Sequence, residues 1–384
     1  MSSIVIQGDT SGSITVQAPS VAGTNTLNLQ ASSGTLATTA QASVGTKNLI
    51  INGDMRIDQR NGGASVTPSN QAYVLDRWKN ELTQASKFSI QQVTDAPQGA
   101  INSLKITSLS AYSVISTDQF NIANYIEGNM ISHLNWGSSN AKTVTLSFWV
   151  KSSLTGTFSG ALNNASGNRS YAFEYTILSA NTWEQKSITI AGDITGTWLT
   201  DTGLGIRVCF SLGCGSTITG TANTWTGSFL QQATGATSLL ATNGATLQLS
   251  LVQLEIGDTA TPFENRMYST ELAMCQRYYW KIAEGSGQML GLASYYTSGG
   301  VLLYVQSPSP MRNTPTVDQV NGTDYYGFER NGAVDGLGGS FALYRFNGVG
   351  CQLYTTSGAS GTAGQSGVLW TNNAASYIAL TAEL

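Results

Sequence analysis

Short runs in which apolar and polar residues alternate recur along most of the chain. The clearest of these runs, each bounded by turn residues such as Gly, Asn and Asp, are 143–152, 169–177, 183–193, 205–213 and 245–258. A period of two is typical of strands that bury one face and expose the other. Regular short strands separated by turns predict an antiparallel β-sandwich over residues 47–267.

The alternation also predicts which side chains face the core of this sandwich. These are the apolar residues at every second position: Val144, Leu146, Phe148, Val150, Tyr171, Phe173, Tyr175, Ile206, Val208, Phe210, Leu247, Leu249, Leu251, Leu254 and Ile256. The pattern slips near Val252, because the spacing of two that runs to Leu251 resumes only at Leu254. A slip of one residue indicates a β-bulge.

One stretch, residues 268–285, predicts a helix that connects two β domains. Leu272, Cys275 and Tyr279 recur there at helical spacing. Strand-like pieces return afterwards, so residues 286–384 are predicted to form a smaller C-terminal β domain. The predicted fold class is therefore mainly β, with two β domains joined by one short helix.

Residues 1–46 form a distinct segment in which Asp9 is the only charged residue. Three short alternating runs in it, 3–8, 13–18 and 26–31, resemble strands. None of them can bury a core alone, so the segment is expected to be flexible or to become ordered against neighbouring chains.

The polarity of the chain comes from neutral side chains, because charged residues make up only 10% of it and the net charge is -4. No basic cluster is present, which argues against nucleic-acid binding. No run approaches the roughly 20 apolar residues that a membrane span needs. The start of the chain lacks the basic and apolar regions of a signal peptide, so neither export by that route nor membrane insertion is expected.

The four cysteines do not form the dense pattern of a disulfide framework. Cys209 and Cys214 bracket a short glycine-bearing stretch, so a disulfide across a hairpin is one alternative. Reduced, partly buried thiols are the favoured interpretation.

Charged residues gather at the two ends of the predicted sandwich. They are Asp54, Arg56, Asp58, Arg60, Asp76, Arg77, Glu264 and Arg266. We expect Arg–carboxylate pairs among them to clasp the ends of the domain together or to bridge subunits. Exposed pairs would add little stability, so the clasp requires partial burial. The alternative is a solvated charged surface.

The sequence offers little catalytic chemistry. It lacks the motifs of zinc proteases, P-loop proteins, serine hydrolases and dinucleotide-binding proteins. The single histidine, His133, is more often structural than catalytic in such a setting. Zinc or iron sites are not expected with so few ligands, and no cofactor is predicted. Carboxylate pairs for glycoside hydrolysis could come from four residues without a sequence signature: Glu127, Glu174, Asp193 and Asp201.

Tryptophans are concentrated in the sandwich segment and suggest a binding function. Aromatic faces stack on the C–H faces of sugars, and amide side chains bond to hydroxyl groups. Trp198 and Trp225 lie in polar, loop-like runs and are the candidate carbohydrate-binding residues. Trp78 and Trp149 are predicted to be core residues instead.

Four pieces of the sequence, taken in order, resemble virion fibre proteins of tailed phages and prophages. The first is "NLIINGDMRIDQRNGG" (48–63) followed by "YVLDRWK" (73–79). The second is "LVQLEIGDTATPFENRMYSTELAMCQRYYWK" (251–281). The last two are "SPMRNTPTV" (309–317) and "YIALTAEL" (377–384).

The resemblance implies a non-enzymatic virion structural protein, located on the tail or the capsid surface and made in the host cytoplasm. It implies a jelly-roll sandwich similar to carbohydrate-binding modules, a homotrimer, and a tail fibre that contacts host-surface polysaccharide during adsorption. Residues 1–46 would then attach to other virion proteins. The alternatives are a capsid decoration fibre, a polysaccharide depolymerase and a spacer without a ligand.

Overall fold

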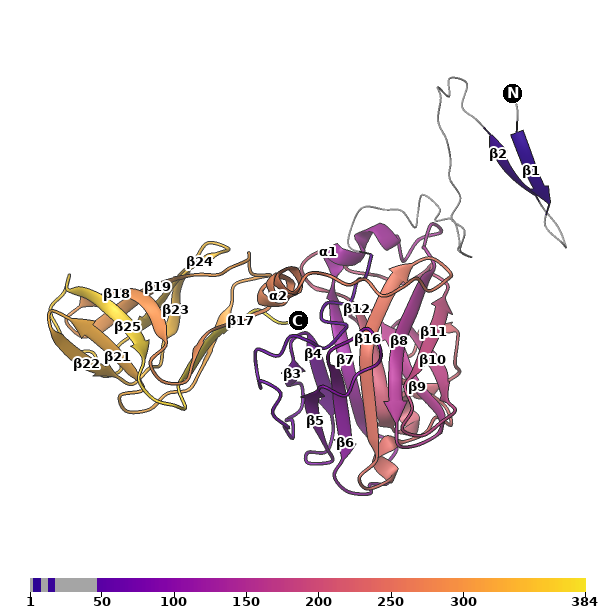
Figure 1. The fold of residues 1–384 in the computed structure, drawn as a ribbon, viewed down its shortest axis with the longest axis horizontal. Helices are drawn as coiled ribbons and strands as arrows, with labels where there is room; N and C mark the ends of the chain where they lie inside the picture. The colour runs from indigo at the N-terminus through magenta and orange to yellow at the C-terminus, as the bar shows by residue number, and fades with distance from the viewer. Residues whose placement is uncertain (1–2, 8–12, 18–46) are drawn as a thin grey trace. The chain divides into compact units, whose positions relative to one another are not determined.

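The structure is a computed structural model that describes residues 3–7, 13–17 and 47–384 (Figure 1). The chain divides into two compact units, Met1–Val44 and Gly45–Leu384. The second unit contains the candidate site.

The described part of the first unit is a short hairpin. β1 (Ser3–Gln7) and β2 (Ser13–Gln17) pair antiparallel, with Ile4 opposite Val16. These strands coincide with two of the alternating runs in the sequence. The third run, residues 26–31, lies outside the described residues.

The second unit begins with an antiparallel β-sandwich, drawn from indigo to orange in Figure 1. The strand order in its first sheet is β14 (Trp225–Thr226), β10 (Ser170–Ile177), β9 (Gly156–Asn163), β12 (Leu204–Cys214), β7 (Gln119–Glu127), β4 (Trp78–Leu82) and β3 (Tyr73–Leu75). The order in its second sheet is β11 (Glu184–Ile190), β8 (Val144–Ser152), β16 (Thr246–Ile256), β6 (Ser103–Ser108) and β5 (Phe88–Val93). Strands that are distant in sequence lie side by side, as in a jelly roll. The predicted fold class is confirmed.

Short elements connect the strands of the sandwich. They are α1 (Gly128–Ile131), η1 (Ser132–Leu134), η2 (Ser216–Ile218), β13 (Thr219–Gly220), β15 (Gln232–Ala233) and η3 (Leu239–Ala241). β13 and β15 form a separate parallel pair.

The two sheets share one hydrophobic core. Phe148 of the second sheet lies with its ring centroid 5.0 Å from those of both Phe210 and Tyr175 in the first sheet. Trp78 is fully buried, as predicted. The residues predicted to face inward lie in the core except two residues of β16: Ile256, its last residue, is 37% exposed, and Leu251 faces outward while Val252 takes its place in the core. Alternation alone therefore located nearly all of this part of the core.

The predicted bulge in β16 is confirmed. Ser250 pairs with Trp149 on β8, and the next pair joins Gln253 to Ser147, so β16 carries one extra residue. Leu251 takes a left-handed backbone conformation (φ 51°) at this point. Gly53 packs against the bulge so closely that a Cβ atom there would lie 2.1 Å from the Val252 carbonyl oxygen, which is why glycine is required.

The helix predicted over 268–285 is wrong in its second half. α2 spans Tyr268–Gln276, whereas Tyr279–Glu284 forms β17. Aromatic and branched side chains favour a strand here, and ladder hydrogen bonds to β26 (Tyr377–Thr381) outweigh the helical spacing. The C-terminal β domain therefore begins at Tyr279 rather than at residue 286.

The C-terminal domain has two sheets around its own core, drawn in orange and yellow in Figure 1. The smaller sheet has the order β17, β26 and β20 (Thr316–Gln319). The larger has the order β22 (Ala333–Leu337), β21 (Tyr326–Arg330), β25 (Ser366–Thr371), β18 (Met289–Thr297), β19 (Gly300–Gln306), β24 (Gly350–Thr355) and β23 (Ala342–Phe346).

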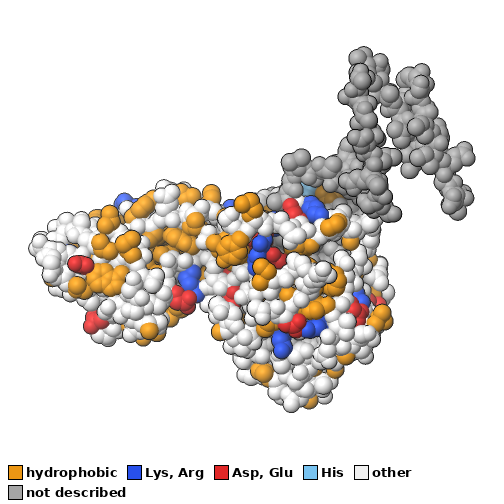
Figure 2. Space-filling model, in the orientation of Figure 1, with side chains coloured by type: hydrophobic (Ala, Val, Ile, Leu, Met, Phe, Trp, Pro, Cys, Tyr) orange, Lys and Arg blue, Asp and Glu red, His pale blue; other side chains and the backbone are white. Residues whose placement is uncertain are grey.

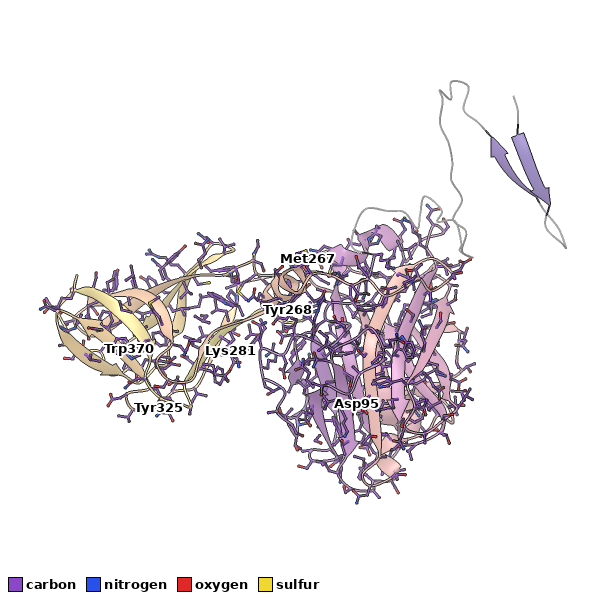
Figure 3. All side chains as sticks on the ribbon, in the orientation of Figure 1. Asp95, Met267, Tyr268, Lys281, Tyr325 and Trp370 are labelled. Atoms are coloured by element: carbon purple, nitrogen blue, oxygen red, sulfur yellow. The ribbon has the colours of Figure 1, made fainter. Side chains whose placement is uncertain are left out.

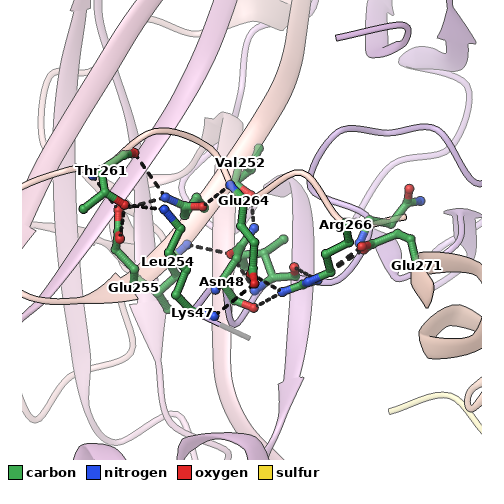
Figure 4. Close-up of polar contacts among 12 residues, drawn as sticks. Lys47, Asn48, Val252, Leu254, Glu255, Thr261, Glu264, Arg266 and Glu271 are labelled. Carbon is green, nitrogen blue, oxygen red and sulfur yellow. Dashed lines mark hydrogen bonds and ion pairs between the residues drawn. The ribbon is translucent and has the colours of Figure 1, made fainter. Parts of the chain in front are cut away.

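The two ends of the sandwich lie side by side (Figure 4). The backbone N–H of Leu49 donates to the carbonyl oxygen of Leu254 at 2.9 Å. The carboxylate of Glu264 accepts the backbone N–H groups of Lys47 at 3.3 Å and of Asn48 at 2.9 Å. The entry segment is therefore held by the segment that leaves the domain.

Arg266 is the centre of this closure, and its side chain is only 5% exposed. Its guanidinium pairs with Glu264 at 3.0 Å and with Glu271 on α2 at 3.3 Å. It also donates to the backbone carbonyl oxygens of Asn48 and Ile50. One side chain thus connects the start of the sandwich, its end and the helix that follows.

The other charged residues predicted for the clasp are arranged in several ways. Asp54 pairs with Arg56 at 2.8 Å, and Arg56 donates to the carbonyl oxygen of Arg266 at 2.5 Å. In the described part of the chain Asp58 has no cationic partner. Its carboxylate accepts two backbone N–H groups of the turn that follows it.

Arg60 and Arg77 bind a partner that the sequence analysis missed. Both pair with the carboxylate of Glu383 near the end of the chain, Arg60 at 2.9 Å. The guanidinium of Arg77 also stacks 3.5 Å from the ring centroid of Tyr278. These contacts join the sandwich to the C-terminal domain.

Asp76 lies buried at the same junction. Its carboxylate accepts the backbone N–H of Gln59 at 2.7 Å and the side-chain amide at 2.6 Å. Burial raises the pKa of Asp76 to about 7, although the nearby charge of Arg60 acts in the opposite direction. The junction therefore contains a carboxyl group that titrates near neutrality.

We expect Arg266→Ala to lower the free energy of unfolding by about 3 kcal/mol, because the buried Glu271 and two backbone carbonyl groups lose their partner. Chemical denaturation of the full chain measures this loss. Arg345→Ala, at an exposed position of β23, is the control and should change stability by less than about 0.5 kcal/mol. Equal stability of the two variants would contradict the central role of Arg266.

The raised pKa of Asp76 predicts a pH dependence with a definite sign. Between its ordinary value of 3.8 and about 7, the folded state holds a proton that the unfolded chain has lost. The contribution of Asp76 to stability therefore falls as pH rises through this window, by at most about 1.4 kcal/mol per pH unit. Asp76→Asn removes the titrating group. The stability of the variant relative to the wild type should therefore increase as the pH is raised from 4 to 7. Parallel stability–pH curves for the two proteins would refute the shift.

Candidate functional site

A cleft of about 500 Å³ opens on the outward face of the second sheet. Two loops, 94–102 and 258–265, form its walls, and strands β8, β11 and β16 form its floor. Its lining is Gln98, Gly99, Ser147, Trp149, Gln185, Leu251, Ala260, Thr261, Pro262, Phe263 and Asn265. The described lining residues are all uncharged, in a mixture of aromatic, amide and hydroxyl groups.

Trp149 is the largest side chain of the floor, and its prediction as a core residue is wrong. It is partly exposed, opposite Gln185 on β11 and Ser250 on β16. Phe148 points into the core, so the next residue of the strand must point outward. The alternation of 143–152 contained this signal.

The bulge in β16 adds an apolar side chain to the same floor. It turns Val252 into the core, where it is fully buried, and leaves Leu251 to line the cleft. Bulges often re-aim side chains in this way next to functional sites.

The wall formed by loop 258–265 is tied to the closure of the sandwich (Figure 4). Glu255 on β16 accepts both the backbone N–H and the hydroxyl of Thr261, at 2.8 and 2.6 Å. The ammonium group of Lys47, at the domain entrance, donates to the carbonyl oxygen of Pro262 at 2.5 Å. This loop is therefore held at both the sheet and the entry segment.

The wall formed by loop 94–102 is anchored by Asp95, which is labelled in Figure 3. Its carboxylate pairs with Lys151 on β8 and accepts hydrogen bonds from Gln248 at 3.1 Å and from the indole of Trp183 at 3.3 Å. The hydrogen bond from Lys151 is the main cause that holds the pKa of Asp95 below its ordinary value. The wall is thus fixed to two strands of the floor.

Three amide side chains of the lining have no hydrogen-bond partner within residues 47–384: Gln98, Gln185 and Asn265. Each offers two N–H donors and one carbonyl acceptor. Together with the ring of Trp149, they suit an uncharged ligand that has hydroxyl groups and an apolar face.

The two tryptophans predicted to bind carbohydrate are placed elsewhere. Trp198 is only 7% exposed, and its indole N–H donates to Asp193 at 3.2 Å. Its ring centroid lies 4.7 Å from Trp136 and 5.5 Å from Trp225. Trp225 is partly exposed, but its ring also packs on Trp136 at 5.4 Å. The polar loops fold inward to cover this cluster, so Trp198 offers no free face to a ligand, and the prediction for it is wrong.

The candidate carboxylates for hydrolysis are engaged in structural contacts or lie outside the cleft. Glu127 is fully buried and pairs with Arg277 at 2.6 Å. Asp193 binds Arg169 through two hydrogen bonds of 2.7 and 2.6 Å. Burial tends to raise the pKa of Asp193, but the hydrogen bonds from Arg169 and its neighbours lower it below its ordinary value. The lining residues of the cleft include none of the four: Glu127, Glu174, Asp193 and Asp201.

His133 lies in η1, and burial together with the charge of Lys142 lowers its pKa. Over 3–7, 13–17 and 47–384, no three His, Cys, Asp or Glu side chains are grouped as metal ligands. The helices in those ranges are all too short or too polar to cross a bilayer.

The four cysteines are free thiols: Cys209, Cys214, Cys275 and Cys351. The sulfur of Cys214 lies 3.3 Å from the hydroxyl of Ser211. Burial raises the pKa of the thiol groups, so they are poor nucleophiles. The disulfide alternative for Cys209 and Cys214 is not formed.

A scan against models of protein families gives no match, and a search of curated proteins also gives none. Solved structures with some similarity include the enzymatically active domain of tailspike protein 4 from bacteriophage CBA120, with 12% identity, a TM-score of 0.32, and coverage of 55% of this chain and 21% of that chain. The family 11 carbohydrate-binding module of a cellulosomal cellulase from Clostridium thermocellum has 12% identity, a TM-score of 0.26, and coverage of 53% and 100%. The xylan-binding domain CBM22-1 from Paenibacillus barcinonensis has 8% identity, a TM-score of 0.25, and coverage of 52% and 99%.

These similarities are too distant to carry an argument about function. The chain spans about a fifth of the tailspike protein that it resembles. The resemblance to virion fibre proteins stays a prediction that rests on the sequence motifs, and the site is interpreted from its own geometry.

Proposed function

We propose that the sandwich binds carbohydrate in the cleft of its second sheet. The observation that carries this proposal is the outward-facing ring of Trp149 among three amides that have no hydrogen-bond partner within residues 47–384, Gln98, Gln185 and Asn265. The electron-rich face of an indole attracts the C–H groups of a sugar ring. The amides match the hydroxyl groups around such a ring, since each can both donate and accept.

The arrangement of the walls supports the same proposal. A ligand site gains affinity when its groups are already held in place, because less freedom is lost on binding. Glu255 and Lys47 hold one wall, and Asp95 holds the other.

We further propose that the cleft binds without cleaving its ligand. Glycoside hydrolysis normally uses two carboxylates flanking the bond, and the described lining of the cleft supplies none. The rival function is depolymerisation of host polysaccharide. Incubation of the full chain with that polysaccharide, followed by analysis for released oligosaccharides, separates the two functions.

The wider role that we propose is that of a structural protein of a phage or prophage virion. It rests on the four sequence motifs and on the strand-forming segment at residues 1–46, which would attach to other virion proteins. The protein would be a tail fibre that contacts host-surface glycans during adsorption, with a capsid decoration fibre as the alternative. Antibody labelling of intact particles distinguishes the tail from the capsid.

A homotrimer is part of this proposal and finds support in an apolar face of the C-terminal domain. The outward face of the seven-stranded sheet carries Leu292 at 75%, Met289 at 72%, Tyr296 at 56%, Tyr304 at 53% and Tyr344 at 43% exposure. Figure 2 shows hydrophobic side chains gathered over this domain. Exposed apolar patches of this kind mark interaction surfaces, and aromatic residues and methionine are enriched in them.

We expect Leu292→Lys to break the trimer, because it places a charge in the centre of the apolar face. Analytical ultracentrifugation of the full chain measures the mass. Ile101→Lys, at an equally exposed position of the sandwich (72%), is the control and should leave the trimer intact. A wild-type protein that stays monomeric at all concentrations would refute the trimer.

We expect Trp149→Ala to weaken binding to host-surface polysaccharide about tenfold or more, because the stacking surface is lost. Surface plasmon resonance with immobilised polysaccharide measures the change. Tyr268→Ala removes another exposed aromatic side chain (57%), on α2 and outside the cleft, and should bind as the wild type does. Wild-type affinity in the Trp149 variant would place carbohydrate binding elsewhere.

A further inference from the structure

We propose, on the basis of the proposed function, that the cleft is one part of a longer groove with a second sugar subsite at Trp183. The groove would take an uncharged oligosaccharide of at least two sugar units. The cleft around Trp149 does not by itself define the size and charge of the ligand.

Trp183, the residue directly before β11, lies on the same side of the second sheet as Trp149. Trp149 lies opposite Gln185 in the pairing of β8 with β11, and Trp183 precedes Gln185 by two residues. Lys151, two residues after Trp149, lies with its ammonium group 5.3 Å from the ring centroid of Trp183. Positions two residues apart on a strand are about 7 Å apart, which is of the order of one sugar ring with its linkage.

Trp183 is held in position, although it lies outside a strand, directly before β11. Its indole N–H donates to the carboxylate of Asp95 at 3.3 Å, and Lys151 lies over its ring. The ring is partly exposed beside the wall formed by loop 94–102. A fixed, partly exposed indole next to a cleft with a second indole is suited to stack on the next sugar of a chain.

Three cations beside this groove already have partners. Lys151 binds Asp95, and Lys186 binds Glu184 at 2.6 Å. Lys47 donates to the hydroxyl of Thr261 and to a backbone carbonyl group. An acidic sugar would find no unpaired cation among these described residues, and it would lose hydration without a compensating ion pair. An uncharged sugar avoids this penalty.

The test compares the full-length wild type with Trp149→Ala, Trp183→Ala and Trp183→Tyr. Each protein is applied to an array of bacterial-surface saccharides, both uncharged and acidic, that range from single sugars to long chains. We expect the wild type to bind uncharged saccharides, with affinity that rises from one sugar to two. Trp183→Ala should lower affinity for the longer chains about tenfold and leave single sugars unchanged. Trp149→Ala should weaken the binding of both single sugars and longer chains. Trp183→Tyr keeps a stacking ring and should retain most of the wild-type affinity for longer chains.

Two results would overturn this inference while the proposed function stands. One is equal binding by Trp183→Ala and the wild type at every chain length, and the other is a preference of the wild type for acidic saccharides. Binding of no saccharide by the wild type would overturn both proposals. Circular dichroism and thermal denaturation confirm that each variant is folded before its binding is compared.

Discussion

Closure of the sandwich at Arg266 is the interaction on which the rest of the structure depends. Its guanidinium holds the entry segment at Asn48, the exit segment at Glu264 and the first turn of α2 at Glu271. This contact fixes both ends of the sandwich to the helix, and the pairs of Arg60 and Arg77 with Glu383 add a second connection to the domain that follows. The wall of the cleft depends on the same region, because Lys47 reaches from the entry segment to Pro262.

The chain uses few charges and places many of them where parts of the fold meet. Charged residues form 10% of the sequence. Arg266 acts at the closure of the sandwich, Arg77 with Glu383 at the junction of the domains, and Lys151 with Asp95 at the wall of the cleft. Burial makes the pairs of Arg77 and Arg266 costly to break, since the remaining partner is left without compensation. Neutral polar residues cover most of the rest, and they also line the cleft.

The candidate site was predictable only in part. The alternation of residues 143–152 directs Trp149 outward once Phe148 is assigned to the core, so the sequence did contain that signal. No such pattern indicated that Trp198 is buried. A polar loop can fold inward when the indole N–H of its tryptophan donates to a buried carboxylate, as Trp198 does to Asp193. The amides of the cleft come from separate loops, and no local pattern connects Gln98 with Asn265.

The sequence by itself determined the fold class, the inward-facing residues and the bulge near Val252, because all three follow from the period of neighbouring residues along one strand. Tertiary structure alone decided where α2 ends, since pairing with β26 draws Tyr279–Glu284 into a sheet against its helical spacing. It also decided that Arg60 and Arg77 meet Glu383, and that two loops enclose a cleft. Those contacts join residues far apart in the chain, and their geometry is set by how the sheets pack rather than by any local preference.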